Sequence, residues 1–258
     1  MGKTALVTGA TSGIGASFAR LLASKGYDLV LVARDEVRLN EIANVLSTDF
    51  GIISEIIRAD LSIGDQLKLV EDRISIVTSP IDVLVNNAGF GLNKSFLLSD
   101  IAAEQQLLDV LVRTPMRLMH AVLPVMKSRN TGIIINVSSV AAWIAGGTYS
   151  AAKSYLTVLS ESLHTELSGT NVKVLALGPG FTRTEFHQRG RMRMNGLPNF
   201  MWLDADRVAA KAWQDVNDGK AISVPGWQYQ ILSSFARFAP RPLVRKLGMN
   251  VRVRQRQK

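Results

Sequence analysis

The sequence predicts an α/β fold in which helices cover both faces of a doubly wound parallel sheet of about seven strands. Short runs of valine, isoleucine and leucine alternate with longer helix-like stretches almost throughout the 258 residues. These apolar runs show little polar alternation, which is typical of strands buried on both faces. Strands and helices that alternate at this spacing join parallel neighbours through right-handed crossovers. The length is sufficient for one sizeable domain.

The expected elements can be placed in order along the chain. Strands are expected at residues 5–8, 28–32, 52–58, 83–86, 132–137, 173–177 and 221–224. Helices are expected at residues 13–25, 36–48, 64–78, 100–128, 149–168 and 205–218. The uncharged stretch 131–152 is long enough to cross a bilayer, but Asn136, Ser138, Ser139 and several glycines interrupt it. We interpret it as a strand, a loop and the start of a helix.

Composition excludes several classes of chemistry. The chain has no cysteine, which excludes disulfides, thiolate metal sites and cysteine nucleophiles. The histidines, His120, His164 and His187, lie far apart in the sequence, so no metal site is expected. The N-terminal residues lack the long apolar stretch of a secretory signal. We therefore expect a soluble, cytoplasmic protein.

Positive charge is concentrated at the end of the chain. The net charge is +9, yet residues 237–258 hold eight basic residues and no acid, and the remainder holds 22 basic against 21 acidic residues. Residues 227–258 also interleave these bases with apolar side chains, so we predict a basic amphipathic C-terminal extension. Such a segment can lie peripherally on an anionic membrane, or pack on its own body or on a partner subunit. Packing is the preferred interpretation, and no nucleic-acid partner is expected because no reading motif is present.

A glycine-rich turn follows the first predicted strand. There the backbone can approach a pyrophosphate, and the helix that follows presents free N–H groups at its N-terminus. The alternative is a purely structural turn. The predicted cofactor contacts in this turn are Gly9, Thr11, Ser12, Gly13, Ile14 and Gly15.

The spacing Gly-x-x-x-Gly-x-Gly at residues 9–15 is one of several motifs that resemble the short-chain dehydrogenase/reductase family. The others are Asn-Asn-Ala-Gly at 86–89, Tyr149-Ser-Ala-Ala-Lys153 and Pro179-Gly180, and the resemblance covers residues 2–224. It implies a single Rossmann-type dinucleotide-binding catalytic domain at 1–226, with a substrate loop at about 181–203. It also implies a homodimer or homotetramer assembled through 100–128 and 149–168. The further cofactor contacts that it implies are Asp60, Leu61, Asn87, Ala88, Gly89, Tyr149, Lys153, Pro179, Gly180, Thr182 and Thr184.

The end of the second predicted strand indicates which dinucleotide binds. NAD-preferring folds place an acid there to hold the ribose 2′-hydroxyl, whereas this chain has Arg34 followed by Asp35. A guanidinium can bind a 2′-phosphate through two hydrogen bonds. NADP(H) is therefore predicted in preference to NAD(H). The alternative is that Arg34 is a solvated loop residue and Asp35 holds the ribose.

Tyr149 and Lys153 are the candidate reacting pair. They lie four residues apart at the start of a predicted helix and so share a face. A tyrosine with its ordinary pKa of about 10 is a poor base at neutral pH, and a nearby ammonium lowers that pKa. The resemblance makes Lys153 a ligand of the nicotinamide ribose as well. It also implies a serine that holds the substrate oxygen, Ser139, with Ser138 as the alternative.

The chain departs from the family pattern at Leu111. Most relatives carry there an asparagine that kinks the helix and connects the lysine to a water relay. Leucine has no side-chain group that binds water, so the relay is rebuilt or turnover is slow.

The predicted substrate loop is rich in large apolar residues. They are Met192, Met194, Leu197, Phe200, Met201 and Trp202. Such a loop is a lid over an apolar substrate or an ordinary packing segment. The favoured function is therefore an NADP(H)-dependent oxidoreductase that interconverts a hydrophobic ketone and its secondary alcohol. The alternatives are a non-catalytic NADP(H) sensor or scaffold, and a sugar-nucleotide epimerase or dehydratase, which the lack of a second substrate domain disfavours.

Overall fold

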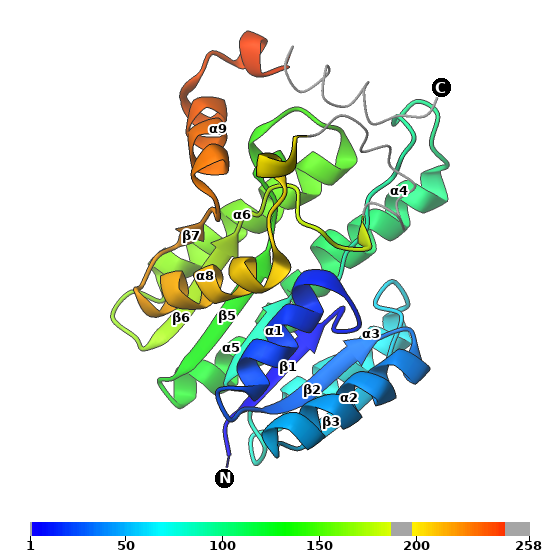
Figure 1. Cartoon of the computed structure of the whole chain (residues 1–258), viewed down its shortest axis with the longest axis vertical. Coiled ribbons are helices and arrows are strands. Elements are labelled where there is room, and N and C mark those ends of the chain that lie inside the picture. Colours follow the sequence, from blue (N-terminus) through cyan, green and yellow to red (C-terminus); the bar gives the residue numbers. More distant parts are fainter. Residues whose placement is uncertain (1, 187–197, 246–258) are drawn as a thin grey trace.

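The computed structural model describes residues 2–186 and 198–245, and its strands form one parallel sheet in the order β3-β2-β1-β4-β5-β6-β7 (Figure 1). Every pair of neighbouring strands is parallel. The strands are β1 (Thr4–Thr8), β2 (Asp28–Ala33), β3 (Ser54–Arg58), β4 (Val83–Asn86), β5 (Gly132–Val137), β6 (Val172–Leu177) and β7 (Ile222–Ser223). The predicted Rossmann-type doubly wound sheet is confirmed, and its order reverses between β1 and β4.

Helices flank this sheet, as the sequence predicts. The α-helices are α1 (Gly13–Ala23), α2 (Glu36–Phe50), α3 (Gly64–Ile74), α4 (Ile101–Leu108), α5 (Thr114–Ser128), α6 (Thr148–Glu166), α8 (Ala205–Asn217) and α9 (Trp227–Phe238). Short 3₁₀ turns lie at η2 (Val140–Trp143) and η3 (Asn199–Met201). None of the helices in the described part of the chain is both long and apolar enough to cross a membrane.

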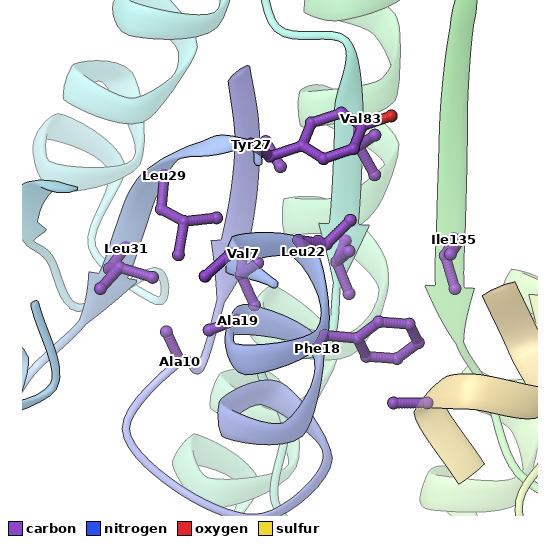
Figure 2. Packing of buried hydrophobic residues seen from close by; sticks show 14 of the residues in the cluster. Val7, Ala10, Phe18, Ala19, Leu22, Tyr27, Leu29, Leu31, Val83 and Ile135 are labelled. Carbon is purple, nitrogen blue, oxygen red and sulfur yellow. The ribbon is translucent and has the colours of Figure 1, made fainter. Parts of the chain in front are cut away.

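Two apolar cores, one on each face, hold the layers together. Successive residues of β1 point to opposite faces, so Val7 belongs to one core and Leu6 to the other. On the first face Phe18 and Leu22 of α1 pack onto the sheet beside Val7 (Figure 2). α2 and α8 complete this layer, and α3, α5 and α6 supply the second. Because both faces are covered, the strands are apolar without alternation, which is the pattern that predicted them.

The predicted helix at 100–128 is interrupted. The structure has α4, then a π-helical turn, η1 (Asp109–Arg113), and then α5. Pro115 has no N–H group and cannot donate the ordinary α-helical hydrogen bond to Leu111. Instead, the N–H of Thr114 reaches back to the carbonyl of Asp109. The bend that most relatives form at an asparagine is thus present with leucine at position 111, and the proline supplies its physical cause.

Candidate active site

A cavity of about 1100 Å³ lies at the carboxyl ends of the strands, where the sheet order reverses. Ligands of open α/β sheets bind at this position. It brings together most of the residues that the sequence singles out. The predicted site residues on its wall are Gly9, Thr11, Ser12, Gly13, Ile14, Arg34, Asp60, Leu61, Asn87, Ala88, Gly89, Ser139, Tyr149, Lys153, Pro179, Gly180, Thr182 and Thr184.

Gly15 is the predicted site residue that does not line this cavity. A Cβ atom at this position would lie 2.2 Å from the carbonyl oxygen of Gly9 and 2.4 Å from Nδ2 of Asn87. The glycine is therefore required for the close approach of α1 to the turn. It positions the N-terminus of α1 instead of contacting a ligand directly.

Asn87 fixes the glycine-rich turn to the end of β4. Its Nδ2 donates to the carbonyl oxygens of Thr8, at 2.9 Å, and of Gly9, at 3.1 Å. The hydroxyl of Thr8 accepts in return from the backbone N–H groups of Asn87 and Ala88, at 2.9 and 3.0 Å. The Asn-Asn-Ala-Gly motif therefore has a structural role: it shapes the turn at the end of the first strand. The sequence alone does not reveal this role.

Arg34 and Asp35 have different surroundings at the end of β2. The Arg34 side chain is 67% exposed and lines the cavity, with Nη1 3.9 Å from Oδ2 of Asp60. Asp35 is the N-cap of α2, and its Oδ1 accepts from the N–H of Arg38 at 3.1 Å. Its other oxygen lies 3.7 Å from Nε of Arg38. Arg34 and Asp35 therefore both line the cavity, but the Asp35 carboxylate is also engaged in capping α2.

Asp60 lies in the loop that follows β3, close to Arg34. Burial works to raise its pKa, but hydrogen bonds from the side chain and backbone of Ser62 and the charge of Arg34 outweigh it, and the pKa is lowered. The carboxylate accepts from the Ser62 hydroxyl at 2.7 Å and from its N–H at 2.9 Å. Asp60 thus forms a fixed negative group on the cavity wall.

Tyr149 and Lys153 both reach the cavity from the first turns of α6. The ammonium of Lys153 lies 5.8 Å from the centre of the Tyr149 ring and donates to the Val137 carbonyl at 2.6 Å. The Tyr149 ring contacts that of Phe186, with centroids 6.0 Å apart. Lys153 is 4% exposed, so its charge is almost completely removed from water.

The structure gives the opposite direction to the expectation that Lys153 lowers the pKa of Tyr149. Burial raises the pKa of Tyr149 to about 12, although a hydrogen bond with Ser139 opposes the shift. Burial also lowers the pKa of Lys153 to about 8. The cause is that both groups are desolvated and the ammonium donates to a backbone carbonyl at 2.6 Å. The raised pKa favours the protonated form of Tyr149, which suits a proton donor.

The structure separates the two candidate serines. The Ser138 hydroxyl is buried, 2.8 Å from the carbonyl of Lys153 and 2.7 Å from the hydroxyl of Thr157. Ser139 is the N-cap of the short turn η2, and its Oγ accepts from the N–H of Ala141 at 3.1 Å. Ser139 retains a hydroxyl proton to donate and shares a hydrogen bond with Tyr149. This geometry favours Ser139 as the serine beside the reacting oxygen. Ser138 instead helps to hold α6 in place.

Leu111 fills the space between the turn η1 and the Asn-Asn-Ala-Gly segment. It is 1% exposed, and a Cβ atom on Gly89 would lie 2.8 Å from its Cδ2. It borders a second cavity of about 10 Å³ that is also lined by Thr8, Asn86 and Lys153. Leu111 therefore packs close to the buried ammonium without offering it a hydrogen-bond partner.

The two described ends of the predicted substrate loop meet beside the cavity. The N–H of Leu203 donates to the carbonyl of Phe181 at 2.8 Å, and the N–H of Arg183 donates to the carbonyl of Leu203 at 2.9 Å. Phe181, Phe186 and Met201 line the cavity. Met192, Met194 and Leu197 lie outside the described residues.

Tyr229 of α9 is the residue of this site that the sequence did not reveal. Its hydroxyl donates to the carbonyl of Met201 at 2.5 Å and accepts from the N–H of Phe181 at 3.0 Å, so it holds both ends of the loop. A Cβ atom on Gly180 would lie 2.1 Å from the Tyr229 ring, which explains the glycine there. No motif marks Tyr229, and the only signal is the amphipathic pattern of residues 227–238.

The residues present fit a nicotinamide dinucleotide. Glycines without side chains form the turn before α1, and α1 has no acidic residue in its first turn to repel a phosphate. Arg34 places a cation, and Asp60 a carboxylate, at the end of the cavity near β2 and β3. Residues 2–186 and 198–245 contain no group of three or more side chains suited to a metal.

Comparison with known proteins supports this interpretation. A family model described as short chain dehydrogenase matches residues 3–194. An uncharacterised oxidoreductase of Staphylococcus epidermidis is 36% identical over 185 residues, which are 70% of this chain and 79% of that protein. Members of the family have been solved with NADPH or with NAD, so membership leaves the choice of cofactor open.

Two solved structures resemble this chain over nine tenths or more of its length. A short-chain dehydrogenase from Sphingobium yanoikuyae in complex with NADPH is 31% identical, with a TM-score of 0.83, covering 99% of this chain and 98% of that one. An alcohol dehydrogenase from Comamonas testosteroni, described as specific for bulky-bulky ketones, is 30% identical. Its TM-score is 0.79, and the match covers 90% of this chain and 91% of that one.

Proposed function

We propose that this chain, which belongs to the short-chain dehydrogenase family and is an oxidoreductase, uses NADP(H) to interconvert a bulky apolar ketone and its secondary alcohol. The observation that carries the proposal is the position of Ser139, Tyr149 and Lys153 on the wall of one large cavity beside the glycine-rich turn. The resemblance gives Tyr149 and Lys153 cofactor contacts as well, but cofactor binding alone would not require Ser139 beside them. The triad therefore favours catalysis over a cofactor sensor.

In the proposed reduction, the bound cofactor supplies the hydride that adds to the carbonyl carbon. Tyr149 donates its phenolic proton to the carbonyl oxygen, which Ser139 orients through its hydroxyl. The ammonium of Lys153 compensates the negative charge left on Tyr149. Because this charge develops only during the reaction, the ammonium stabilises the transition state more than the ground state. The alcohol forms by gain of one hydride and one proton.

Arg34 and Asp35 support the preference for NADP(H). Both residues line the cavity, but the Asp35 carboxylate already accepts the N–H of Arg38 and caps α2, whereas the Arg34 side chain is 67% exposed. A 2′-phosphate beside Arg34 would gain charge-assisted hydrogen bonds.

The lining of the cavity supports an apolar substrate. Apolar side chains of the substrate loop, of residues 90–110, of α9 and of positions just after η2 and after α9 line the cavity. The larger of these side chains are Phe90, Leu92, Leu107, Val110, Ile144, Phe181, Phe186, Met201, Leu232, Phe235 and Val244. A substrate with a large group on each side of the carbonyl buries most of its surface there.

The helices that the resemblance assigns to subunit contacts carry exposed apolar residues. Ile101 of α4 is 75% exposed, Met116 of α5 is 41% exposed and Val158 of α6 is 61% exposed. Exposed apolar side chains at several such positions favour burial against another subunit. This supports the proposal that the chain forms a homodimer or homotetramer.

The reaction is tested by NADPH oxidation with a graded panel of ketones, from acetone to diaryl and polycyclic ketones. We expect kcat/KM to rise with the apolar size of the substrate and NADH to be the poorer cofactor. Activity confined to small polar ketones would contradict the substrate class. Tight NADPH binding without turnover of any ketone would instead support the non-catalytic sensor.

Arg34→Ala is expected to lower the preference for NADPH over NADH by roughly 10- to 100-fold, because hydrogen bonds to a charged group contribute about 1.5–3 kcal/mol. The measurement is kcat/KM for each cofactor with one saturating ketone. Arg58→Ala is the matched control, since Arg58 has a similarly exposed side chain but does not line the cavity. An unchanged ratio in Arg34→Ala would contradict the assignment of Arg34 to the 2′-phosphate.

A further inference from the structure

Helix α9 has two faces with different surroundings. One face carries Tyr229, Ser233 and Ala236, which are buried and line the cavity. The other face carries large apolar residues whose exposed fractions lie between 46% and 85%: Trp227, Ile231, Leu232, Phe235 and Phe238. Single exposed apolar residues are normal on a protein surface, but five on one helix form a continuous apolar surface.

Helix α9 lies at an extremity of the molecule. Figure 1 shows α9 standing away from the sheet, at the end of the molecule opposite the N-terminus. The helix packs against η2, and its five large apolar residues keep 46% to 85% of their surface exposed.

Basic residues follow the same helix in the sequence. Arg237 is directed back to the body, with its guanidinium 5.5 Å from the ring centre of Trp143 and 3.8 Å from Oε1 of Glu161. Arg241 and Arg245 are exposed, and no carboxylate of the described residues lies within 4.0 Å of either. The sequence of residues 246–258 adds five more bases, and no acidic residue follows Asp218.

We propose that the exposed face of α9, together with the basic residues that follow it, docks on an anionic lipid surface. Apolar side chains insert at the boundary between headgroups and acyl chains, and nearby arginine and lysine residues attract the anionic headgroups. The near-neutral charge of the rest of the chain means that this attraction acts at one end of the molecule.

Charge favours an anionic lipid surface over a second copy of the chain as the partner of this face. A symmetric contact through α9 would bring the same patch of each subunit together. Each copy contributes the exposed Arg241 and Arg245, and residues 237–245 contain no acid, so the contact would oppose like charges. An anionic lipid surface instead offers opposite charge and an apolar layer at the same place.

Docking in this manner also places the cavity next to the lipid. Leu232 is 48% exposed and Phe235 is 46% exposed, and both also line the cavity, so they border solvent and cavity at once. If the proposed function holds, this continuity gives an apolar ketone a route from the lipid to Tyr149. The docking itself is measured without turnover, so its failure and a failure of the proposed function can be distinguished.

The experiment is co-sedimentation of the full chain with vesicles of phosphatidylcholine, with and without about a third phosphatidylserine. We expect binding to the anionic vesicles that weakens with salt, and little binding to the neutral ones. Ile231→Ser/Phe238→Ser is expected to weaken binding at least about tenfold, because it removes two inserted side chains that do not line the cavity. Arg241→Gln/Arg245→Gln is also expected to weaken binding by about tenfold or more.

Matched substitutions on another part of the surface complete the test. Ile53→Ser/Val77→Ser removes two apolar residues that are 73% and 68% exposed and lie far from α9 in the sequence, and we expect vesicle binding to be unchanged. Absence of binding to anionic vesicles would overturn the proposal. So would binding that depends on the arginines but not on Ile231 and Phe238, accompanied by equal affinity for a short DNA duplex. A self-association that Ile231→Ser/Phe238→Ser abolishes, without vesicle binding, would assign the face to a second subunit instead.

Discussion

Tyr149→Phe is expected to lower kcat/KM for ketone reduction by about 10³-fold, which is within the usual effect of a general acid. Phenylalanine removes the proton donor and keeps the aromatic ring that contacts Phe186 at 6.0 Å between centroids. Because burial raises the pKa of Tyr149 to about 12, the wild-type phenol carries its proton at every pH at which the enzyme is assayed. The loss in the variant should therefore be nearly independent of pH below about 8, where Lys153 also keeps its proton. The measurement is initial-rate kinetics of NADPH oxidation.

The control for Tyr149→Phe is a second tyrosine on the same helix. Tyr155 is 37% exposed and does not line the cavity, so Tyr155→Phe should leave kcat/KM nearly unchanged. NADPH binding by Tyr149→Phe, followed through the fluorescence of the nicotinamide, should also remain close to that of the wild type. If Tyr149→Phe keeps most of its turnover, another group donates the proton and the proposed mechanism is wrong.

The sheet could be predicted because its strands are buried on both faces. Leu6 and Val7 point to opposite cores and both are apolar, so the run is apolar at every position. The end strands were predicted less well. The strand expected at 221–224 has only the residues Ile222–Ser223 in β7, and the one expected at 52–58 begins at Ser54. Edge strands are held by one neighbour, and their length depends on tertiary packing that the local sequence does not record.

The sequence predicted one continuous helix at 100–128, whereas the structure interrupts it. Leu111 replaces the asparagine that kinks this helix in most relatives, yet a bend is present as the turn η1. Its cause, the missing N–H of Pro115, was visible in the sequence as part of the segment Arg113-Thr-Pro. The identity of the side chain at position 111 therefore does not decide whether the backbone bends there.

The candidate site was more predictable in its residues than in its electrostatics. Motifs placed the glycine-rich turn, Tyr149 and Lys153, because each lies next to a recognisable strand or helix. They did not predict the raised pKa of Tyr149, because that shift depends on the burial of both groups and on the direction of the Lys153 ammonium. Nor did they reveal Tyr229, whose partners Phe181 and Met201 lie 48 and 28 residues away in the sequence.

Lys153→Met is expected to lower kcat/KM for ketone reduction by about 10²- to 10³-fold and to change its dependence on pH. Burial lowers the pKa of Lys153 to about 8, so in the wild type the ammonium loses its proton as the pH rises through that value. Since the protonated form stabilises the charge left on Tyr149, wild-type kcat/KM should fall above about pH 8, and the variant should show no such fall. Lys127→Met, at an exposed position of α5, is the control and should retain the wild-type profile.

Stability provides a second readout for Lys153 that does not depend on turnover. The pKa of Lys153 is about 8 in the folded protein and 10.5 in the unfolded chain, so between these values the unfolded state binds more protons. The free energy of unfolding of the wild type should therefore increase with pH across this window, relative to that of Lys153→Met. Below pH 8 the folded protein carries the full cost of a buried charge, and above pH 10.5 that cost is absent. Denaturant unfolding of both proteins at pH 7, 9 and 10.5 measures the difference. If the two proteins keep a constant difference across these pH values, the ammonium is not desolvated, and the pH dependence of turnover must come from another group.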